Sequence, residues 1–327
     1  PLYLGKDDSV SHRQQRAFAT IEWSASDNNV INVGALVEEH ELSETEISPR
    51  VSLTHTFNRN HKIRFGVSQA KRGPFIFETM ADQSFSQDLT SGGVPIPPGL
   101  GIPTSLYEQI ILSDQDLKSE KITSREIAYF GEFLNSALLV NGRVFYDSIS
   151  RYIDTLRESA PPGDNVPDDI TDPASPNTML VFYNVTESTT TGAEIELDYH
   201  IDSSLRLIAS GALIHIRSDS DAASRSAPQR SYSFLVSKRF NNNYNSSLGY
   251  YFVEGFKWMD ARGTDDYRIL DLRLSRNFRS NWSNGSISLV LKNLLDDYSD
   301  YSSPPRNPTA PQVIQSTQAY IDFRLNF

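Results

Sequence analysis

Three acidic residues alternate with apolar residues along one segment and could support acid–base chemistry. Glu194, Glu196 and Asp198 are spaced two positions apart, and neighbouring carboxylates can act as a general acid and a general base. Because side chains two positions apart on a β-strand share one face, the same spacing fits a strand whose polar face lines an aqueous interior. We favour this second interpretation. Three arginines of other alternating segments could pair with these carboxylates: Arg64, Arg273 and Arg324.

The histidines and an acidic stretch are the remaining candidates for metal binding. Six histidines are scattered along the chain, and His55 and His61 flank a predicted turn, where polar strand-end residues are common. An acidic stretch between positions 164 and 172 carries four aspartates, whose carboxylates could bind Ca²⁺. It lacks the ordered spacing of a calcium loop, and prolines lie within and beside it. We therefore interpret the stretch as a solvent-exposed loop and expect no metal site.

Composition and the catalytic motifs argue against several classes of protein. The chain has no cysteine, which excludes disulfides, zinc–thiolate sites and cysteine nucleophiles. It contains no G-x-S-x-G, no H-E-x-x-H and no glycine-rich phosphate loop. The 30 Lys and Arg against 41 Asp and Glu give a net charge of −11, whereas phosphate binding requires a basic surface. We expect neither an enzyme nor a cofactor-binding protein, and no nucleic-acid partner.

Alternation of apolar and polar residues is the dominant pattern of the whole sequence. In the last segment, Ala319, Ile321, Phe323 and Leu325 alternate with polar or amphipathic residues, which predicts a strand with one apolar and one polar face. No apolar run approaches the roughly 20 residues of a membrane helix, but strands of about 9–11 residues can cross a bilayer in a barrel. The pattern predicts about thirteen strands, over residues 13–26, 30–42, 46–58, 61–72, 123–134, 136–153, 178–200, 203–218, 228–240, 244–258, 265–278, 284–297 and 314–327.

Short polar turns alternate with longer connections along the chain. Turns such as 27–29 and 241–243 alternate with predicted loops such as 73–122 and 154–177. In an antiparallel sheet this places the tight turns at one end and the large loops at the other, which is typical of outer-membrane barrels. We therefore predict an all-β fold, an antiparallel up-and-down transmembrane β-barrel, with one barrel domain over residues 1–327. Because complete single-chain bacterial barrels have an even number of strands, an odd count predicts that this barrel is partial.

Four motifs, in this order and with these separations, carry a resemblance to a known family. They are Ser48-Pro49-Arg50 followed by Ile63-Arg64-Phe65, then Thr191-Gly192-Ala193-Glu194, then Asn293-Leu294-Leu295-Asp296, and a terminal Phe327. In this arrangement the chain resembles the TonB-dependent receptors, the outer-membrane active transporters of Gram-negative bacteria.

The resemblance implies an architecture and a function. Family members have a barrel of about 22 strands that is plugged by an N-terminal domain, so the predicted strands would be the last thirteen or so, with the plug and the early strands missing. It further implies energy-coupled uptake of a scarce ligand such as a ferric siderophore, cobalamin or a carbohydrate. The implied partners are outer-membrane lipid, a TonB-type energy-coupling protein acting on the full-length protein, and a small-molecule ligand such as a metal chelate or a sugar.

Candidate site residues follow from position in this scheme. The predicted ligand-binding residues of the outer loops are Arg72, Phe75, Phe77, Glu78 and Tyr107. The predicted lumen-facing polar residues are Arg64, Glu194, Glu196, Asp198, Arg273 and Arg324, and Phe327 would be the C-terminal signal of the barrel.

Two alternatives remain open. One is a passive porin-like or adhesive outer-membrane barrel without energy coupling. The other is a soluble β-rich carbohydrate-binding protein, whose apolar strand faces would be buried against a second layer rather than exposed.

Overall fold

The computed structural model describes most of the chain. The described residues are 11–41, 43–91, 94–95, 105–113, 116–162, 164–166, 168, 176–219, 221–240, 243–257, 263–279, 284–299 and 314–326. Phe327, the predicted C-terminal signal, lies outside them.

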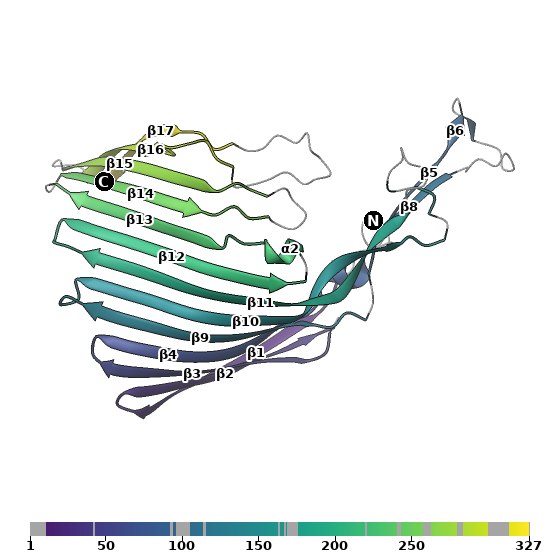
Figure 1. Ribbon diagram of the computed structural model, residues 1–327, viewed down its shortest axis with the longest axis horizontal. Helices are drawn as coiled ribbons and strands as arrows, with labels where there is room; N and C mark the ends of the chain where they lie inside the picture. Colours follow the sequence, from purple (N-terminus) through teal and green to yellow (C-terminus); the bar gives the residue numbers. More distant parts are fainter. Residues whose placement is uncertain are drawn as a thin grey trace.

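Thirteen strands follow one another in a single antiparallel path, each hydrogen-bonded to its neighbours (Figure 1). Their bounds are β1 Gln14–Ser26, β2 Asn29–His40, β3 Glu46–Asn58, β4 His61–Arg72, β9 Glu120–Phe133, β10 Leu138–Ser159, β11 Thr178–His200, β12 Leu205–Ser218, β13 Arg230–Arg239, β14 Tyr244–Val253, β15 Tyr267–Arg279, β16 Asn284–Lys292 and β17 Gln318–Asn326. The sheet is open, with β1 and β17 at its two edges. The predicted up-and-down order is confirmed, and most strand bounds agree with the predicted ones within a few residues.

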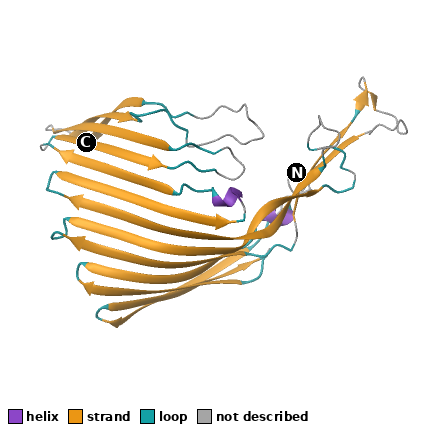
Figure 2. Cartoon of the chain, in the orientation of Figure 1, coloured by secondary structure: helices purple, strands orange, loops and turns teal. Residues whose placement is uncertain are grey.

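The strand register keeps apolar side chains together on one face, which we call the apolar face. Leu274 of β15 faces Leu289 of β16, which in turn faces Ile321 of β17. This face is exposed: Leu213 is 59% and Ile321 68% accessible. In the described part of the chain, the sheet has no second layer against that face (Figure 2). Exposure of the apolar face argues against the soluble alternative, in which a second layer would bury it.

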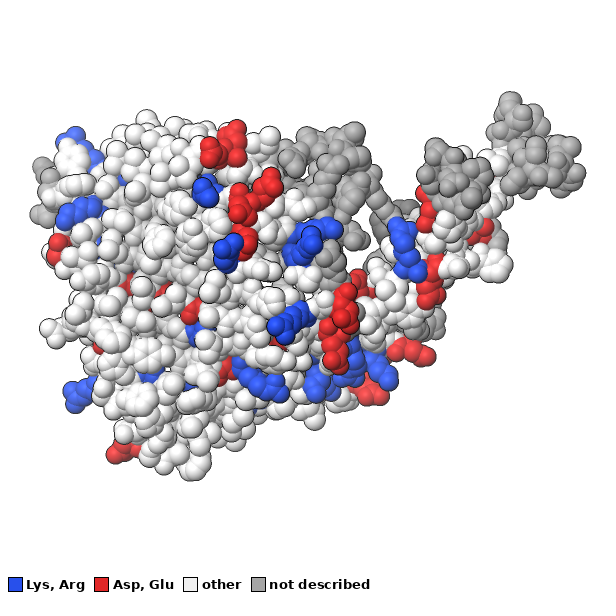
Figure 3. Space-filling view, in the orientation of Figure 1, with Lys and Arg blue, Asp and Glu red and all other residues white. Residues whose placement is uncertain are grey.

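Charged residues lie mainly toward the ends of the strands in the view of Figure 3, which leaves a largely uncharged band between them. One end of the sheet, the turn end, has short connections such as that between β1 and β2. The opposite end, the loop end, has the long connections, among them the one between β4 and β9. Among the described residues, no helix has the length and apolar character needed to span a membrane.

The predicted loop 73–122 is wrong, because much of this segment is folded. It contains helix α1 (Ile76–Met80), β5 (Asp82–Asp88) and β8 (Ser105–Ser113), and the short β6 (Thr90–Ser91) and β7 (Val94–Pro95) pair with each other. β5 is antiparallel to β8, and β8 runs parallel to β11 at Leu180–Phe182. The prediction failed because β8 depends on a partner strand that lies about 70 residues away in the sequence and so leaves no local signal.

The two longest strands provide that partner. β10 has 22 residues and β11 has 23, about twice the 9–11 that cross a bilayer. Both continue past the loop end and, with β5 and β8, form an arm that we call the outer sheet (Figure 1). The other described helix, α2 (Asp221–Ser224), lies between β12 and β13.

A β-bulge in β10 separates the main sheet from the outer sheet. The register shifts between Ile149 and Tyr152, and Arg151 has a positive φ of 60°. Bulges bend a strand and leave ladder hydrogen bonds unmade. The freed N–H of Ile153 instead donates to a carboxylate oxygen of Glu120, at 2.8 Å, so the bend is stabilised by a side chain from the start of β9.

Gly192 leaves no room for a side chain, whereas Gly142 does, so these two glycines give a matched pair of substitutions. A Cβ on Gly192 would clash with the ring of Phe145 and lie 2.9 Å from the backbone oxygen of Leu213, whereas a Cβ on Gly142 would meet only the backbone oxygen of Glu194, at 3.6 Å. We expect Gly192→Val to lower the free energy of unfolding by about 1–3 kcal/mol, the usual range for overpacking.

Gly142→Val should leave that free energy unchanged or raise it slightly, because valine favours strands. Denaturant titration of both variants in the same detergent measures the difference. Equal effects at the two glycines would contradict the register between β10 and β11.

Candidate ligand-binding site

A hollow of about 740 Å³ lies along the face opposite the apolar face, which we call the polar face. Its lining runs across eight neighbouring strands, from β3 to β14. One hollow can touch so many adjacent strands only on the concave side of a curved sheet, so the polar face is the concave one. Six of the side chains that line it are Thr54, Arg64, Arg143, Glu194, Glu196 and Tyr251.

Four charged side chains form a continuous row of ion pairs along the polar face, and three of them, Arg64, Arg143 and Glu194, line the hollow. Arg64 of β4 lies 2.6 Å from Glu126 of β9. Arg143 of β10 lies 3.7 Å from the other oxygen of Glu126 and 2.7 Å from Glu194 of β11. The side chains of Arg64 and Arg143 remain about half exposed, so each ion pair contributes little stability. The main effect of these ion pairs is to keep this part of the polar face hydrophilic.

The arginine partners suggested by the sequence are wrong for all three acidic residues. Glu194 pairs with Arg143, and Asp198 pairs with Arg206 of the neighbouring strand at 2.6 Å. Glu196 lines the hollow and has no ion pair within the described residues. Cross-strand partners are set by register, which one strand's sequence does not contain.

Arg273 and Arg324 lie on the polar face of the last strands instead, outside the hollow. Both contact the carboxylate of Asp322 on β17, at 3.1 Å and 3.0 Å. Arg273 also donates to the hydroxyl of Ser288, a fully buried side chain of β16, at 2.9 Å. The predicted polar residues therefore fall into separate groups on one face rather than into a single cluster.

The structure brings three of the predicted outer residues together where β4 ends, at a junction built on Arg72. The guanidinium of Arg72 donates to both carboxylate oxygens of Glu78 in α1, at 2.8 and 3.0 Å, and to Glu120 of β9 at 2.6 Å. It also lies over the ring of Phe75, 4.8 Å from its centroid. Bidentate, charge-assisted bonds are stronger than neutral hydrogen bonds. Arg72 therefore fixes the start of the segment between β4 and β9, which contains α1, β5 and β8 and which we call the outer segment.

Glu78 completes this junction from the loop side. Its carboxylate also accepts the backbone N–H of Phe75 at 2.8 Å, which shapes the entry into α1. Phe75 itself stays 62% exposed. An exposed aromatic ring held by an arginine gives a surface on which a flat ligand group could stack.

The other two predicted outer residues belong to the outer sheet. Phe77 packs edge-on against Phe182 of β11, with ring centroids 5.6 Å apart. Tyr107 of β8 donates to Gln109 at 2.7 Å, and Gln109, which is 3% accessible, donates to Asp82 of β5 at 3.2 Å. These contacts join α1 and β5 to β11 and β8, so they hold the outer sheet together.

Sequence reasoning missed three residues that make central contacts. Glu126 and Arg143 join the ion pairs beside the hollow, and Glu120 binds Arg72 at the junction. All three lie in or beside segments that were predicted as strands, and Arg143 lies between Gly142 and Val144. That alternation could have placed Arg143 on the polar face, whereas Glu126 follows the charged Arg125 and gives a weaker signal. Their partners could not be identified, because pairing needs the register.

The histidines make isolated contacts. His55 lies 2.8 Å from the side chain of Asn29, and His61 lies 2.7 Å from the hydroxyl of Tyr129. Within the described ranges, no group of three or more His, Asp or Glu is placed to hold a metal ion. Part of the acidic stretch lies outside those ranges, but Asp164 and Asp168 are described, and they accept hydrogen bonds from Gln109 and Thr178.

Several solved structures with this fold are receptors. The chain superposes on a variant of the ferric enterobactin receptor PfeA of Pseudomonas aeruginosa with a TM-score of 0.68 and 14% identity, covering 97% of this chain and 45% of that one. For the siderophore receptor PirA of Acinetobacter baumannii the TM-score is 0.64 at 15% identity, with 92% and 46% covered. For the complex of FpvAI with pyocin S2 it is 0.63 at 16% identity, with 95% and 38% covered.

The chain thus spans less than half the length of these structures. At such identities the likeness establishes the fold alone. A search of curated proteins finds no match.

Membership of a family rests on a separate comparison. A family model described as "TonB dependent receptor-like, beta-barrel" matches residues 2–294, which is most of the chain and includes in full two of the four motifs that suggested the resemblance. The strand order and the two-faced sheet agree with that assignment. This chain belongs to the TonB-dependent receptor-like β-barrel family.

Proposed function

We propose that the protein is an outer-membrane receptor of a Gram-negative bacterium that takes up a scarce ligand, a ferric siderophore, by energy-coupled transport. The observation that carries the proposal is the two-faced sheet, with an exposed apolar face and a concave polar face. That arrangement suits a wall between lipid and an aqueous lumen. The solved structures with the same fold include receptors for ferric enterobactin and other siderophores.

The polar face would then line the lumen of the barrel. Arg64, Glu194 and Glu196 would border the hollow, with Asp198, Arg273 and Arg324 on the same wall. In the full-length protein a TonB-type partner would supply the energy, and residues 1–327 would form part of the barrel domain.

The ligand would meet the loop end first. We place its binding surface at the junction of Arg72, Phe75 and Glu78, next to the outer sheet that carries Phe77 and Tyr107. The exposed ring of Phe75 offers stacking area, and Arg72 holds this ring in place. Because Glu78 and Glu120 already neutralise Arg72, the surface would recognise the flat groups of a metal chelate by stacking rather than by charge.

A passive porin-like or adhesive barrel is the second candidate, since the sheet alone would serve it equally well. Uptake of radioactive iron separates the two. Cells whose single siderophore receptor is the full-length protein should accumulate iron from ferric enterobactin, and deletion of the energy-coupling protein should abolish this uptake. Cells without the receptor are the control. Uptake that persists without the coupling protein would establish the passive alternative.

Membrane placement has its own test at Leu289, an apolar-face residue that is 41% accessible. If Leu289 contacts lipid near the middle of the bilayer, Leu289→Arg should lower the free energy of unfolding in bilayers by about 2–4 kcal/mol. Ser52 of β3 faces Asn32 and Gly66 on the polar side, so Ser52→Arg is the matched control and should cost much less. Equal stability of the two variants would argue against a lipid-facing apolar face.

The role of Arg72 can be tested by measuring how readily a protease cleaves the outer segment. Arg72→Gln removes charge-assisted bonds to Glu78 and Glu120, each worth about 1.5–3 kcal/mol, so trypsin should cut after the exposed Lys118 about tenfold faster or more. Arg64→Gln removes an ion pair in the hollow, far along β4 from this junction, and should leave the cleavage rate unchanged. Mass spectrometry of the digest identifies the site. Unchanged cleavage in Arg72→Gln would remove the reason to place the ligand there.

A further inference from the structure

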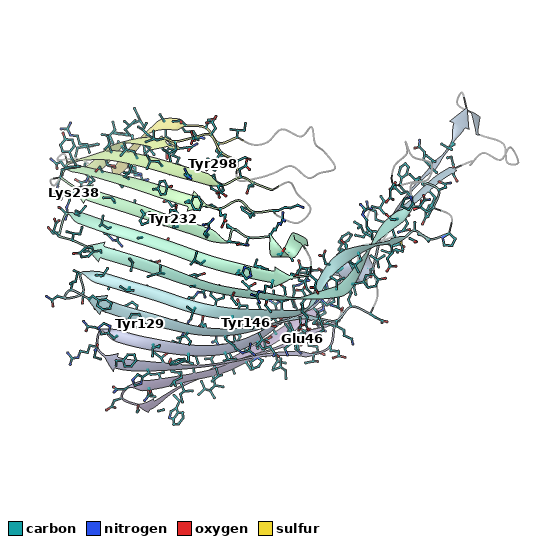
Figure 4. The ribbon with its side chains drawn as sticks, viewed as in Figure 1. Glu46, Tyr129, Tyr146, Tyr232, Lys238 and Tyr298 are labelled. Carbon is teal, nitrogen blue, oxygen red and sulfur yellow. The ribbon has the colours of Figure 1, made fainter. Side chains whose placement is uncertain are left out.

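A groove of about 640 Å³ crosses the apolar face and has no role in the proposed uptake function. One transverse row of paired residues forms its floor: Tyr129, Gly142, Ile195, Gly211 and Tyr232, on β9 to β13. Large side chains alternate with glycines in this row, so each glycine leaves a gap between two large side chains. Figure 4 labels Tyr129 and Tyr232 at the two ends of the row.

The two glycines are not required by contacts within the chain. A Cβ on Gly142 would meet its nearest neighbour at 3.6 Å, and one on Gly211 would meet the side chain of Ile195 at 3.8 Å. Both are ordinary van der Waals distances, whereas a Cβ on Gly192 would clash. Glycine costs stability inside a strand, so two unforced glycines in one row, on either side of Ile195, indicate that the open space itself has a use.

The rows nearer the loop end change from apolar to basic. The next row contains Ile127, Val144, Ala193, Leu213 and Arg230. The row after that contains Arg125, Tyr146, Thr191 and His215, and Arg217 lies two residues beyond His215 on β12. Two residues along a strand correspond to about 6.6 Å, so the basic groups lie about 7–20 Å from the glycines, all toward one end.

The charges of this basic rim, defined as Arg125, Arg217 and Arg230, differ in their partners. Arg230 is paired with Glu254, just beyond β14, through bonds of 2.9 and 3.1 Å, and these bonds lower the pKa of Glu254. Arg125 lies over the ring of Tyr146 at 5.7 Å, and Arg217 donates to His215 at 3.3 Å. Neither Arg125 nor Arg217 has a carboxylate partner among the described residues, and both are exposed.

We propose that this groove binds one acyl chain of an anionic, phosphate-bearing membrane lipid, with the headgroup at the basic rim. The inference rests on the membrane placement of the proposed function, which puts the apolar face in lipid. The groove offers an apolar, glycine-floored channel for the chain, and Arg125 and Arg217 offer uncompensated positive charge at the level of the loop-end headgroups. Toward the turn end the same face carries Lys238 of β13, but Lys238 lies 3.9 Å from the carboxylate of Asp202 and donates to Ser204. The arginines without a described carboxylate partner therefore lie toward the loop end, so the lipid would belong to the leaflet there.

Native mass spectrometry of the detergent-purified protein tests this with phosphatidylglycerol and phosphatidylcholine of identical acyl chains. We expect one retained lipid, with a preference of about fivefold for phosphatidylglycerol, the effect of one basic side chain at a headgroup. Arg217→Gln should reduce this preference without weakening phosphatidylcholine binding. Equal retention of the two lipids by the unaltered protein would overturn the proposal.

Filling the floor separates the groove from general lipid contact. Gly211→Leu, and independently Gly142→Leu, should weaken retention at least about tenfold, the loss expected from about two buried CH₂ groups. Ala209→Leu places the same side chain two residues along β12, on the same face but outside the groove, and should retain the lipid. Circular dichroism confirms folding of each variant. Equal retention by all variants, or equal loss in Ala209→Leu, would contradict the proposal.

The outcome also separates this inference from the function on which it rests. Insertion of the protein into vesicles, without groove-dependent retention of lipid, would refute the lipid site and leave the receptor proposal intact. Failure of the folded protein to insert at all would refute both.

Discussion

Strand register is the constraint on which every other feature of this protein depends. In a bilayer each backbone N–H and C=O must find a partner within the protein, and the antiparallel ladder from β1 to β17 provides these partners. Because side chains alternate along each strand, a slip of one residue would turn a whole strand's apolar set to the other face. The observed register keeps Leu274, Leu289 and Ile321 in one row, and so maintains one exposed apolar face and one concave polar face.

Departures from regular pairing occur where the chain leaves the main sheet. The bulge between Ile149 and Tyr152 frees the N–H of Ile153, which Glu120 accepts. Glu120 in turn binds Arg72, and Arg72 binds Glu78 in α1. This short relay of charged side chains connects the ends of β4 and β9 to the outer segment. The outer sheet can therefore extend from β10 and β11 while its first turn stays anchored to the barrel wall.

The groove on the apolar face shows a different use of the same register. Gly142 and Gly211 come into one row only because β10, β11 and β12 pair as they do. Along the sequence they are almost 70 residues apart, and each resembles any other glycine in a strand. The two glycines lie together in the floor of the groove, and the basic residues lie nearer the loop end. This arrangement is the basis for the lipid site that we propose.

Period-two alternation by itself determined the thirteen strands, their two faces and the sorting of turns and loops, because each of these is a local property of side-chain direction. The motifs around Arg50, Gly192 and Asn293 identified the family for the same reason. Only the tertiary structure decided that Glu194 pairs with Arg143, that Arg72 joins Glu78 to Glu120, and that residues 105–113 form a strand. These contacts join segments that are far apart in sequence, and their partners are chosen by register and curvature, which no single segment contains.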